Sequence, residues 1–245
     1  MPRFFMAGTN ILGGTAIMTG RDAQHVQVLR MRPGEDMIIC DGQGTDYKCR
    51  LIRSDKEEAE AEVIEVVKCP AEPTVKVTVM CGLPKGDKTD YIIQKCVEAG
   101  AQEIVFFDSD RCVAKTKKDK EDKKLERWNR ISEEAAKQSG RGIIPQVSWA
   151  EDLGEVFNIA LHRDLALFMY ETGEREGMDA VLSANKDIKT AAIITGPEGG
   201  FAEFEAELAR KLKFHVCSMG ERILRCETAP VVALTAVMYA TGNLG

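Results

Sequence analysis

The pattern of apolar and polar positions divides the chain into two regions with different periodicities. In the N-terminal region, residues 35–41 and 45–53 are short strand candidates joined by a glycine-rich tight turn at 42–44, and residues 58–67 alternate acidic and apolar positions. Alternation of this kind is typical of a strand with one face in water. Residues 22–29 carry an apolar stripe of helical spacing. The region is therefore predicted to be β-rich with one helix.

The period changes beyond the break Cys69-Pro70-Ala71-Glu72-Pro73, where we place a domain boundary. Strands are predicted at 75–82, 103–107, 165–170, 191–195 and 214–218, with helices at 87–99, 202–212 and 227–241 and a longer helix containing Leu125, Trp128 and Ala135. Strands that alternate with helices imply a mainly parallel sheet covered on both faces. The sequence thus predicts domains at 1–72 and 73–245, the second of the α/β class.

Composition narrows the class of protein. With 245 residues, 44% of them hydrophobic, the chain can bury a core, and no apolar stretch approaches the ~20 residues of a membrane span. The N-terminus also lacks the basic-then-apolar run of a signal peptide, so we expect a soluble, cytoplasmic protein. The eight cysteines form no Cys-x-x-Cys pair, which leaves zinc-ribbon and thioredoxin-type sites without support.

Charge is unevenly distributed along the chain. The net charge of −6 argues against a general polyanion-binding protein. However, residues 111–141 contain eleven basic and six acidic residues, a local charge of +5 that leaves −11 for the rest, with the densest cluster at 114–120. This segment is either a solvated helix face or a patch that contacts nucleic-acid phosphates.

A glycine-rich loop follows the buried strand predicted at 191–195. Residues 196–200 read Gly-Pro-Glu-Gly-Gly and lead into a helix. Ligands bind beyond the carboxyl ends of strands in open α/β sheets, and glycines there admit a ligand close to the backbone. No Gly-Lys-Ser/Thr or Gly-x-Gly-x-x-Gly motif supports a phosphate site, and Glu198 favours a neutral or cationic nucleoside. A tight turn without a ligand is the alternative.

A second loop, residues 218–230, also lies between an apolar strand and an apolar helix. It reads Ser-Met-Gly-Glu-Arg-Ile-Leu-Arg-Cys-Glu-Thr-Ala-Pro. Ile223 and Leu224 could cover a flat ring while main-chain groups recognise its edge. Glu227 or Thr228 would start the next helix, since threonine is a good N-cap. The two loops together indicate a nucleoside pocket.

In these loops the chain closely resembles the ribosomal RNA uridine-N3 methyltransferases of the RsmE type, which are SPOUT-class enzymes. The resemblance is carried by Gly196-Pro197-Glu198-Gly199-Gly200-Phe201 and by Met219-Gly220-x-Arg222-Ile223-Leu224-Arg225-x-Glu227-Thr228-Ala229. It extends through Arg3-Phe4-Phe5, the block that begins at His25, Asp41-Gly42-x-Gly44, Lys85-Gly86-Asp87-Lys88, and the block from Glu134 to Arg141.

This resemblance implies a PUA-like β-barrel for RNA at 1–72 and a SPOUT methyltransferase domain with a trefoil knot at 73–245, usually in a homodimer. It implies S-adenosyl-L-methionine as cofactor and N3 of uridine 1498 in the 16S ribosomal RNA of the small subunit as target. The cofactor residues that it implies, including a third loop after 165–170, are Tyr170, Glu171, Thr195, Gly196, Pro197, Glu198, Gly199, Gly200, Met219, Gly220, Ile223, Leu224, Glu227, Thr228 and Ala229.

Methyl transfer to uridine N3 requires a site that favours the anionic form of the base. An arginine near the uracil oxygens would stabilise that charge. Arg225 is the first candidate and Arg222 the second, with an ion pair or a phosphate contact as the alternative for each. A carboxylate beside the sulfonium would stabilise the ground state more than the transition state, so Glu198 is expected to organise its loop or bind ribose.

Candidate RNA contacts are basic residues, more often phosphate positioners than base readers. They are Arg3, Arg30, Lys85, Lys88, Arg111, Arg127 and Arg141. His25, His162 and His215 have no metal-ligand spacing, and no metal site is predicted; His25 has a packing role or touches RNA. Two other functions stay open: a non-catalytic RNA-binding assembly factor, and a SPOUT enzyme that modifies another base.

Overall fold

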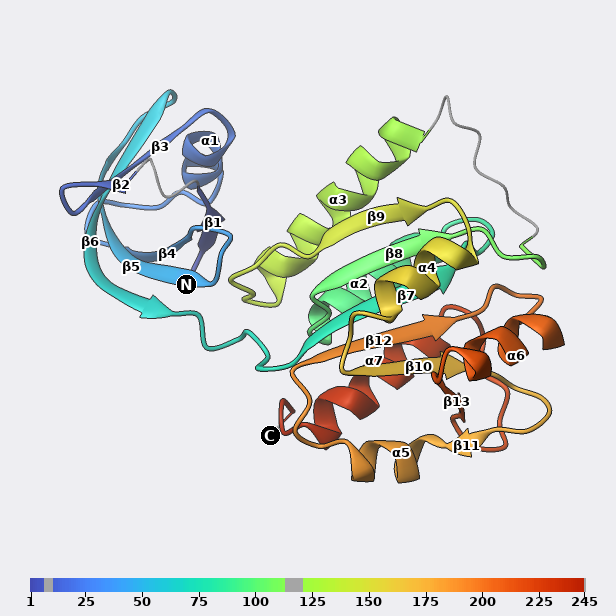
Figure 1. Cartoon of the computed structure of the whole chain (residues 1–245). Coiled ribbons are helices and arrows are strands. Elements are labelled where there is room, and N and C mark those ends of the chain that lie inside the picture. Colours follow the sequence, from blue (N-terminus) through green and yellow to red (C-terminus); the bar gives the residue numbers. More distant parts are fainter. Residues whose placement is uncertain (7–10, 113–120, 245) are drawn as a thin grey trace. The chain divides into compact units, whose positions relative to one another are not determined.

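The computed structural model describes residues 1–6, 11–112 and 121–244 and divides into two compact units (Figure 1). The first unit comprises Met1–Glu72 with Ala136–Ile144, and the second comprises Pro73–Ala135 with Pro145–Gly245. The division after Glu72 falls at the proline-rich break. The inclusion of residues 136–144 in the first unit is a feature that the sequence does not signal.

The first unit is a mixed half-barrel built on one six-stranded sheet. In spatial order its strands are β1 (Arg3–Phe5), β4 (Asp36–Cys40), β5 (Thr45–Ser54), β6 (Glu58–Lys68), β3 (Thr15–Thr19) and β2 (Ile11–Leu12). In the part described, β1 pairs with β4 in parallel and the other neighbours pair antiparallel. Helix α1 (Gly20–Val28) packs on β3, β5 and β6, and the sheet curves around it (Figure 1).

The core of this unit lies between the sheet and α1. Phe4, Met37, Ile39 and Leu51 from the strands meet Val26 of the helix. The alternation of buried and exposed positions along the strands produces this one-sided core. The predicted helix and the three predicted strands are confirmed to within about two residues, whereas β1, β2 and β3 were not predicted from the sequence.

The second unit is built on a seven-stranded parallel sheet. In spatial order its strands are β11 (Glu176–Gly177), β13 (His215–Ser218), β10 (Leu165–Met169), β12 (Thr190–Thr195), β7 (Lys76–Gly82), β8 (Glu103–Phe107) and β9 (Gln146–Ala150). All five residues of β10 are buried, as expected for a strand covered on both faces. The predicted α/β class and parallel sheet are confirmed.

Helices cover both faces of this sheet (Figure 1). One face carries α4 (Leu153–Ala160) and α6 (Glu203–Lys211), which bury Phe157 and Ala206 against the strands. The other carries α2 (Lys88–Glu98) and α7 (Ala229–Ala240), which contact each other while α7 contacts β7 and β12. Two further helices are α3 (Glu121–Gln138) and α5 (Met178–Ala184). None of the helices in the described ranges is long and apolar enough to cross a bilayer.

The strand order brings three loops together. β10 pairs on one side with β12 and on the other with β13, and both pairings are parallel. Parallel neighbours end at the same edge of a sheet. The segments that leave β10, β12 and β13 therefore emerge side by side, although long stretches of sequence separate them.

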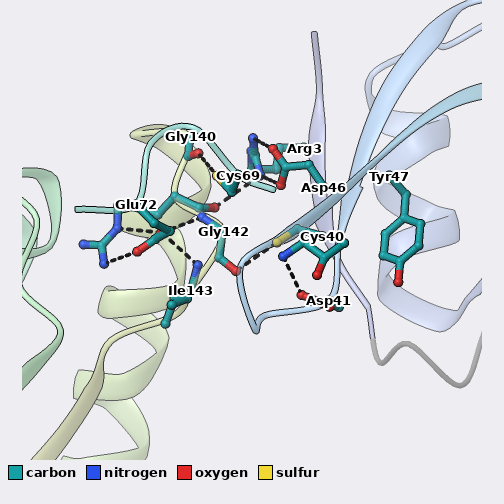
Figure 2. A network of polar contacts seen from close by, with 12 residues as sticks. Arg3, Cys40, Asp41, Asp46, Tyr47, Cys69, Glu72, Gly140, Gly142 and Ile143 are labelled. Carbon is teal, nitrogen blue, oxygen red and sulfur yellow. Dashed lines mark hydrogen bonds and ion pairs between the residues drawn. The ribbon is translucent and has the colours of Figure 1, made fainter. Parts of the chain in front are cut away.

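A buried polar network ties residues 140–143 into the first unit (Figure 2). The carboxylate of Glu72 accepts hydrogen bonds from Nε and Nη2 of Arg141 at 2.9 and 2.8 Å, and from the backbone N–H groups of Gly142 and Ile143 at 2.7 and 3.0 Å. The thiols of Cys40 and Cys69 donate to the carbonyls of Gly142 and Gly140. The Glu72 carboxylate thus holds both the Arg141 guanidinium and the backbone of the two residues that follow Arg141.

Two arginines expected to contact RNA belong to this network. The side chain of Arg141 is 2% exposed and pairs with Glu72. Arg3 is 9% exposed, pairs with Asp46 at 2.6 Å, and also donates to the carbonyl of Arg141. Buried guanidinium groups already paired with carboxylates are not open to a phosphate. We therefore correct the expectation: Arg3 and Arg141 stabilise the first unit.

The structure predicts that Glu72→Gln strongly destabilises the first unit. The change leaves the Arg141 charge buried without its counter-charge, at a cost of about 3–5 kcal/mol. Urea unfolding of the full chain, with amide hydrogen exchange at residues 139–144, measures the loss. Glu65→Gln is the matched control, because its pair with Lys48 is about half exposed and contributes about 0–1 kcal/mol. Equal effects of the two variants would contradict the assignment.

Candidate active site

A cavity of about 420 Å³ lies where β10, β12 and β13 end. All three following segments line it, together with the first residue of α2. Its charged lining comprises four cations, Lys88, Arg175, Arg222 and Arg225, and three carboxylates, Glu171, Glu198 and Glu221. The volume is that of a small-molecule site, and the mixed charge suits a ligand that carries charges of both signs.

The loop after β12 packs too closely for its glycines to be replaced. A Cβ on Gly82, at the end of β7, would lie 2.5 Å from Cδ of Pro197. Gly200 has a φ of +64°, and a Cβ there would overlap the carboxylate of Glu171. A side chain at Gly82 would clash with the ring and backbone of Pro197, and one at Gly200 is disfavoured by its φ and would displace the Glu171 carboxylate. The end of β7 and the loops after β10 and β12 are therefore in direct contact.

Glu198 points from this loop toward the start of α2. Its Oε1 accepts a hydrogen bond from the backbone N–H of Lys85 at 3.0 Å and one from Nζ of Lys88 at 2.8 Å. Burial alone would raise the pKa of Glu198, but these two bonds, with a bond from its own backbone and the charge of Lys88, hold the pKa below its ordinary value. Glu198 is thus an anion whose oxygen is already engaged by the protein.

The loop after β13 is the exposed wall of the cavity. The side chain of Ile223 is 83% exposed, and Arg222 and Arg225 are exposed as well. The carbonyl of Arg225 accepts from the backbone N–H groups of Thr228 and Ala229 at 2.8 and 2.9 Å, which starts α7. Thr228 stands at the N-cap of α7, but its hydroxyl makes no capping hydrogen bond. The expectation that its side chain caps the helix is therefore wrong.

The two arginines differ from the other cations of the cavity in having free head groups. Among the residues that the structure describes, neither the Arg222 nor the Arg225 guanidinium forms a hydrogen bond or ion pair with the protein. Lys88, by contrast, is paired with Glu198 and Glu227, and Arg175 donates to the carbonyl of Gly173 at 3.2 Å. Arg222 and Arg225 can therefore engage an incoming ligand without first breaking a bond.

The cavity also contains two thiols. Burial raises the pKa of Cys217 to about 12 and that of Cys226 to about 11. Both are neutral at physiological pH, and a neutral thiol is a poor nucleophile. Neither thiol is therefore suited to form a covalent intermediate.

Family models match both regions of the chain. One described as an RNA methyltransferase domain matches residues 70–238, and one described as an RNA methyltransferase PUA domain matches residues 18–64. A protein of Bacillus subtilis named ribosomal RNA small subunit methyltransferase E is 37% identical over 93% of this chain and 91% of its own length. The chain belongs to this methyltransferase family.

Solved structures of the family share the fold. A ribosomal RNA small subunit methyltransferase E from Neisseria gonorrhoeae, bound to S-adenosyl methionine, is 29% identical, with a TM-score of 0.83 over 98% of this chain and 97% of its own. A methyltransferase from Legionella pneumophila, in complex with the same cofactor, is 28% identical, with a TM-score of 0.84 over 97% of each chain.

Most of the cofactor residues implied by the family resemblance line the cavity. Twelve of the fifteen do so: Tyr170, Glu171, Thr195, Gly196, Pro197, Glu198, Gly200, Met219, Gly220, Ile223, Leu224 and Ala229. Gly199, Glu227 and Thr228 do not. A Cβ on Gly199 would meet Arg111, at 3.0 Å from its Cβ, which places that glycine against another loop.

Several lining residues were missed from the sequence. They are Met169, Arg175, Cys217, Ser218, Glu221 and Cys226. Met169, Cys217 and Ser218 lie at the carboxyl ends of the strands β10 and β13. The sequence could have indicated them if the last residues of each strand had been counted with the loop that follows. Arg175 has no motif around it.

Of the remaining RNA candidates, Lys88 lines the cavity, whereas Arg30, Lys85, Arg111 and Arg127 are not among the lining residues. Arg30, which has a left-handed φ of 54° after α1, is exposed, as is Lys85. Arg111 is exposed and donates to the carbonyl of Gly199 at 3.3 Å, and Arg127 pairs with Asp90. The lysine-rich stretch 114–120 lies outside the described residues.

Histidine and acidic side chains form no metal site in the ranges that the structure describes. The ring of His25 packs edge-on against Phe4, with ring centroids 5.5 Å apart. Nδ1 of His215 lies 3.0 Å from a carboxylate oxygen of Glu176. The observed ring contact agrees with the packing role considered for His25.

Proposed function

We propose that the protein transfers a methyl group from S-adenosyl-L-methionine to N3 of a specific uridine, position 1498, of 16S ribosomal RNA in the small ribosomal subunit. The observation that carries the proposal is the convergence of three loops on one cavity in a chain of this methyltransferase family. The two guanidinium groups at the cavity wall that have no protein partner in the described structure can stabilise negative charge on the acceptor base.

The residues of the cavity fit the cofactor. The glycines at 196 and 200 expose backbone at the end of β12, where the edge of an adenine ring or a ribose can hydrogen-bond. Met219, Ile223 and Leu224 provide apolar side chains to cover the ring. When bound, the cofactor supplies an electrophilic methyl group on a positively charged sulfur.

The protein's own residues then have to prepare the acceptor. Uridine N3 is a weak nucleophile while protonated, so a positive group beside O2 or O4 favours the anion that attacks the methyl carbon. Arg225 and Arg222 are assigned this role, with Arg225 first. An exposed guanidinium on the cavity wall can reach a base that is turned out of its RNA strand.

Glu198 is assigned to loop organisation. A carboxylate beside the sulfonium would stabilise the cofactor more before transfer than during it, because the charge on sulfur disappears. The bonds from Lys85 and Lys88 occupy Oε1 of this residue, which supports the structural role. Arg30, Lys85, Arg111 and Arg127 remain the proposed contacts to RNA phosphates.

The outer face of α7 supports a homodimer. Apart from Thr235, the helix consists of apolar residues, and Val232 and Tyr239 are 40% and 76% exposed. A helix with so few polar residues is usually buried on most sides, and a second copy of this chain would cover this face.

Light scattering should therefore give a mass of twice 27.0 kDa, and Tyr239→Asp should shift the mass to that of one chain.

Two further features rest on the family resemblance. The strands β10, β12 and β13, whose loops form the cavity, are the proposed knotted segment. A cytoplasmic location follows from the proposed substrate, which is found where ribosomes are assembled.

Gly200→Ala should weaken cofactor binding. The new Cβ, at a φ that alanine rarely adopts, would displace the carboxylate of Glu171, which lines the cavity. Calorimetry with S-adenosyl-L-methionine measures the effect. Gly242→Ala is the control, because its φ of +72° imposes the same backbone strain with nothing within 4 Å of the added Cβ. Normal binding by Gly200→Ala would show that the cofactor lies elsewhere.

Arg225→Ala should lower methyl transfer roughly 100- to 1,000-fold while leaving cofactor affinity unchanged, since it removes one donor to a developing negative charge. Purified small subunits from a deletion strain, a labelled methyl donor and nucleoside mass spectrometry provide the assay. Arg163→Ala, at the amino end of β10, is the control.

The same assay separates the candidate functions. N3-methyluridine must appear with the wild-type protein. Transfer to another base would refute the N3 assignment, and the absence of transfer, with cofactor bound, would favour a non-catalytic assembly factor.

A further inference from the structure

Lys88 occupies a junction between three segments of the second unit. Its Nζ lies 2.8 Å from Oε1 of Glu198, in the loop after β12, and 3.6 Å from Oε2 of Glu227, in the loop after β13. Lys88 itself is the first residue of α2, which follows β7. One ammonium group therefore joins three segments that leave different strands.

Helix stability does not explain a lysine at this position. The N-terminus of a helix carries a partial positive charge, which disfavours a cation in the first turn. Asp87 at the N-cap makes no side-chain capping bond that would offset this cost. The attraction of the two glutamates offsets this cost.

The three charged groups are shielded enough for their attraction to matter. Their side chains are 35%, 27% and 17% exposed, in the order Lys88, Glu198 and Glu227. The hydrogen bond to Glu198 raises the pKa of Lys88. Burial acts to raise the pKa of Glu227, but hydrogen bonds from its own backbone and from Cys226, with the charge of Lys88, hold it below its ordinary value. All three groups stay ionised at neutral pH.

We infer that Lys88 is a positioning residue that holds the loops after β12 and β13 in register and so pre-forms the cofactor cavity. The inference rests on the proposed function in what it says of the cofactor. It replaces the expectation that Lys88 contacts RNA, because two carboxylates already engage this ammonium.

The arrangement acts on each loop through its glutamate. Glu198 is held at one oxygen by Nζ of Lys88 and by the backbone N–H of Lys85, which fixes Gly196–Gly200 relative to β7. Glu227 lies at the junction of the exposed loop and α7, so its attraction to Lys88 limits how far residues 219–226 can swing. Without the ammonium, two like charges would face each other and push the loops apart.

Lys88→Met tests the inference in the full-length protein. Amide exchange without cofactor should increase in residues 196–202 and 219–228, and the Kd for S-adenosyl-L-methionine should rise about tenfold or more, equivalent to about 1.4 kcal/mol. In turnover, KM for the cofactor should rise while kcat stays within about threefold. Lys88→Arg should restore the Kd to within about threefold of wild type, since a guanidinium can pair with both carboxylates.

Lys95→Met is the matched control. Lys95 lies on the same helix, its side chain is also 35% exposed, and it pairs with Glu98 away from the cavity. This variant should change neither loop exchange nor Kd. Glu198→Gln in the Lys88→Met background should partly restore the Kd, because it removes one of the two like charges that the lost ammonium leaves facing each other.

Two results would overturn the inference. One is unchanged loop exchange and cofactor affinity in Lys88→Met, whether or not RNA affinity falls. The other is a loss that Lys88→Arg does not restore. Failure of the proposed function has a different signature: the wild-type protein would not bind S-adenosyl-L-methionine, while the exchange measurement without cofactor would still decide the role of Lys88.

Discussion

The parallel pairing of β10 with both β12 and β13 is the constraint on which the candidate site depends. It directs three loops from distant parts of the sequence to one edge of the sheet, where they enclose a cavity. The strands can pair in this way because they are apolar on both faces and are covered by helices on both sides. The rigid sheet thus sets where the loops start, and the loops set what the cavity binds.

Close packing then determines which residues the loops can contain. Gly82 admits Pro197, and Gly200 admits the carboxylate of Glu171. Each of these contacts joins segments that leave different strands: a side chain at Gly82 would push against the backbone and ring of Pro197, and one at Gly200 would displace the carboxylate of Glu171. Polar contacts complete the arrangement, since Glu198 binds both the backbone and the side chain of the segment after β7. The loop sequence is therefore constrained by neighbouring loops as well as by its ligand.

Sequence periodicity was sufficient for the longer elements, but it did not reveal β9, α4 or α5. The strands and helices that were predicted have patterns that local burial imposes, and the glycine-rich loop follows directly from a strand. The role of Lys88 could not be predicted, because its partner Glu198 is 110 residues away. The same holds for the Glu72–Arg141 pair, 69 residues apart: a basic residue looks the same in a sequence whether its partner is a buried carboxylate or a phosphate. Short elements such as β2 and β11, with two residues each, carry too little pattern to detect.

The positive charges of this protein also differ in what they can do. Arg3 and Arg141 are neutralised inside the first unit, and Lys88 is shared between two glutamates. Their charges contribute to the total of −6 but add little to the field that an approaching polyanion meets. Arg222 and Arg225 lie on an exposed loop without protein partners in the described structure, and a cation without a partner has the larger effect on the local potential. An acidic chain can therefore present a positive cavity wall, because the pairing of each cation matters more for recognition than the number of cations.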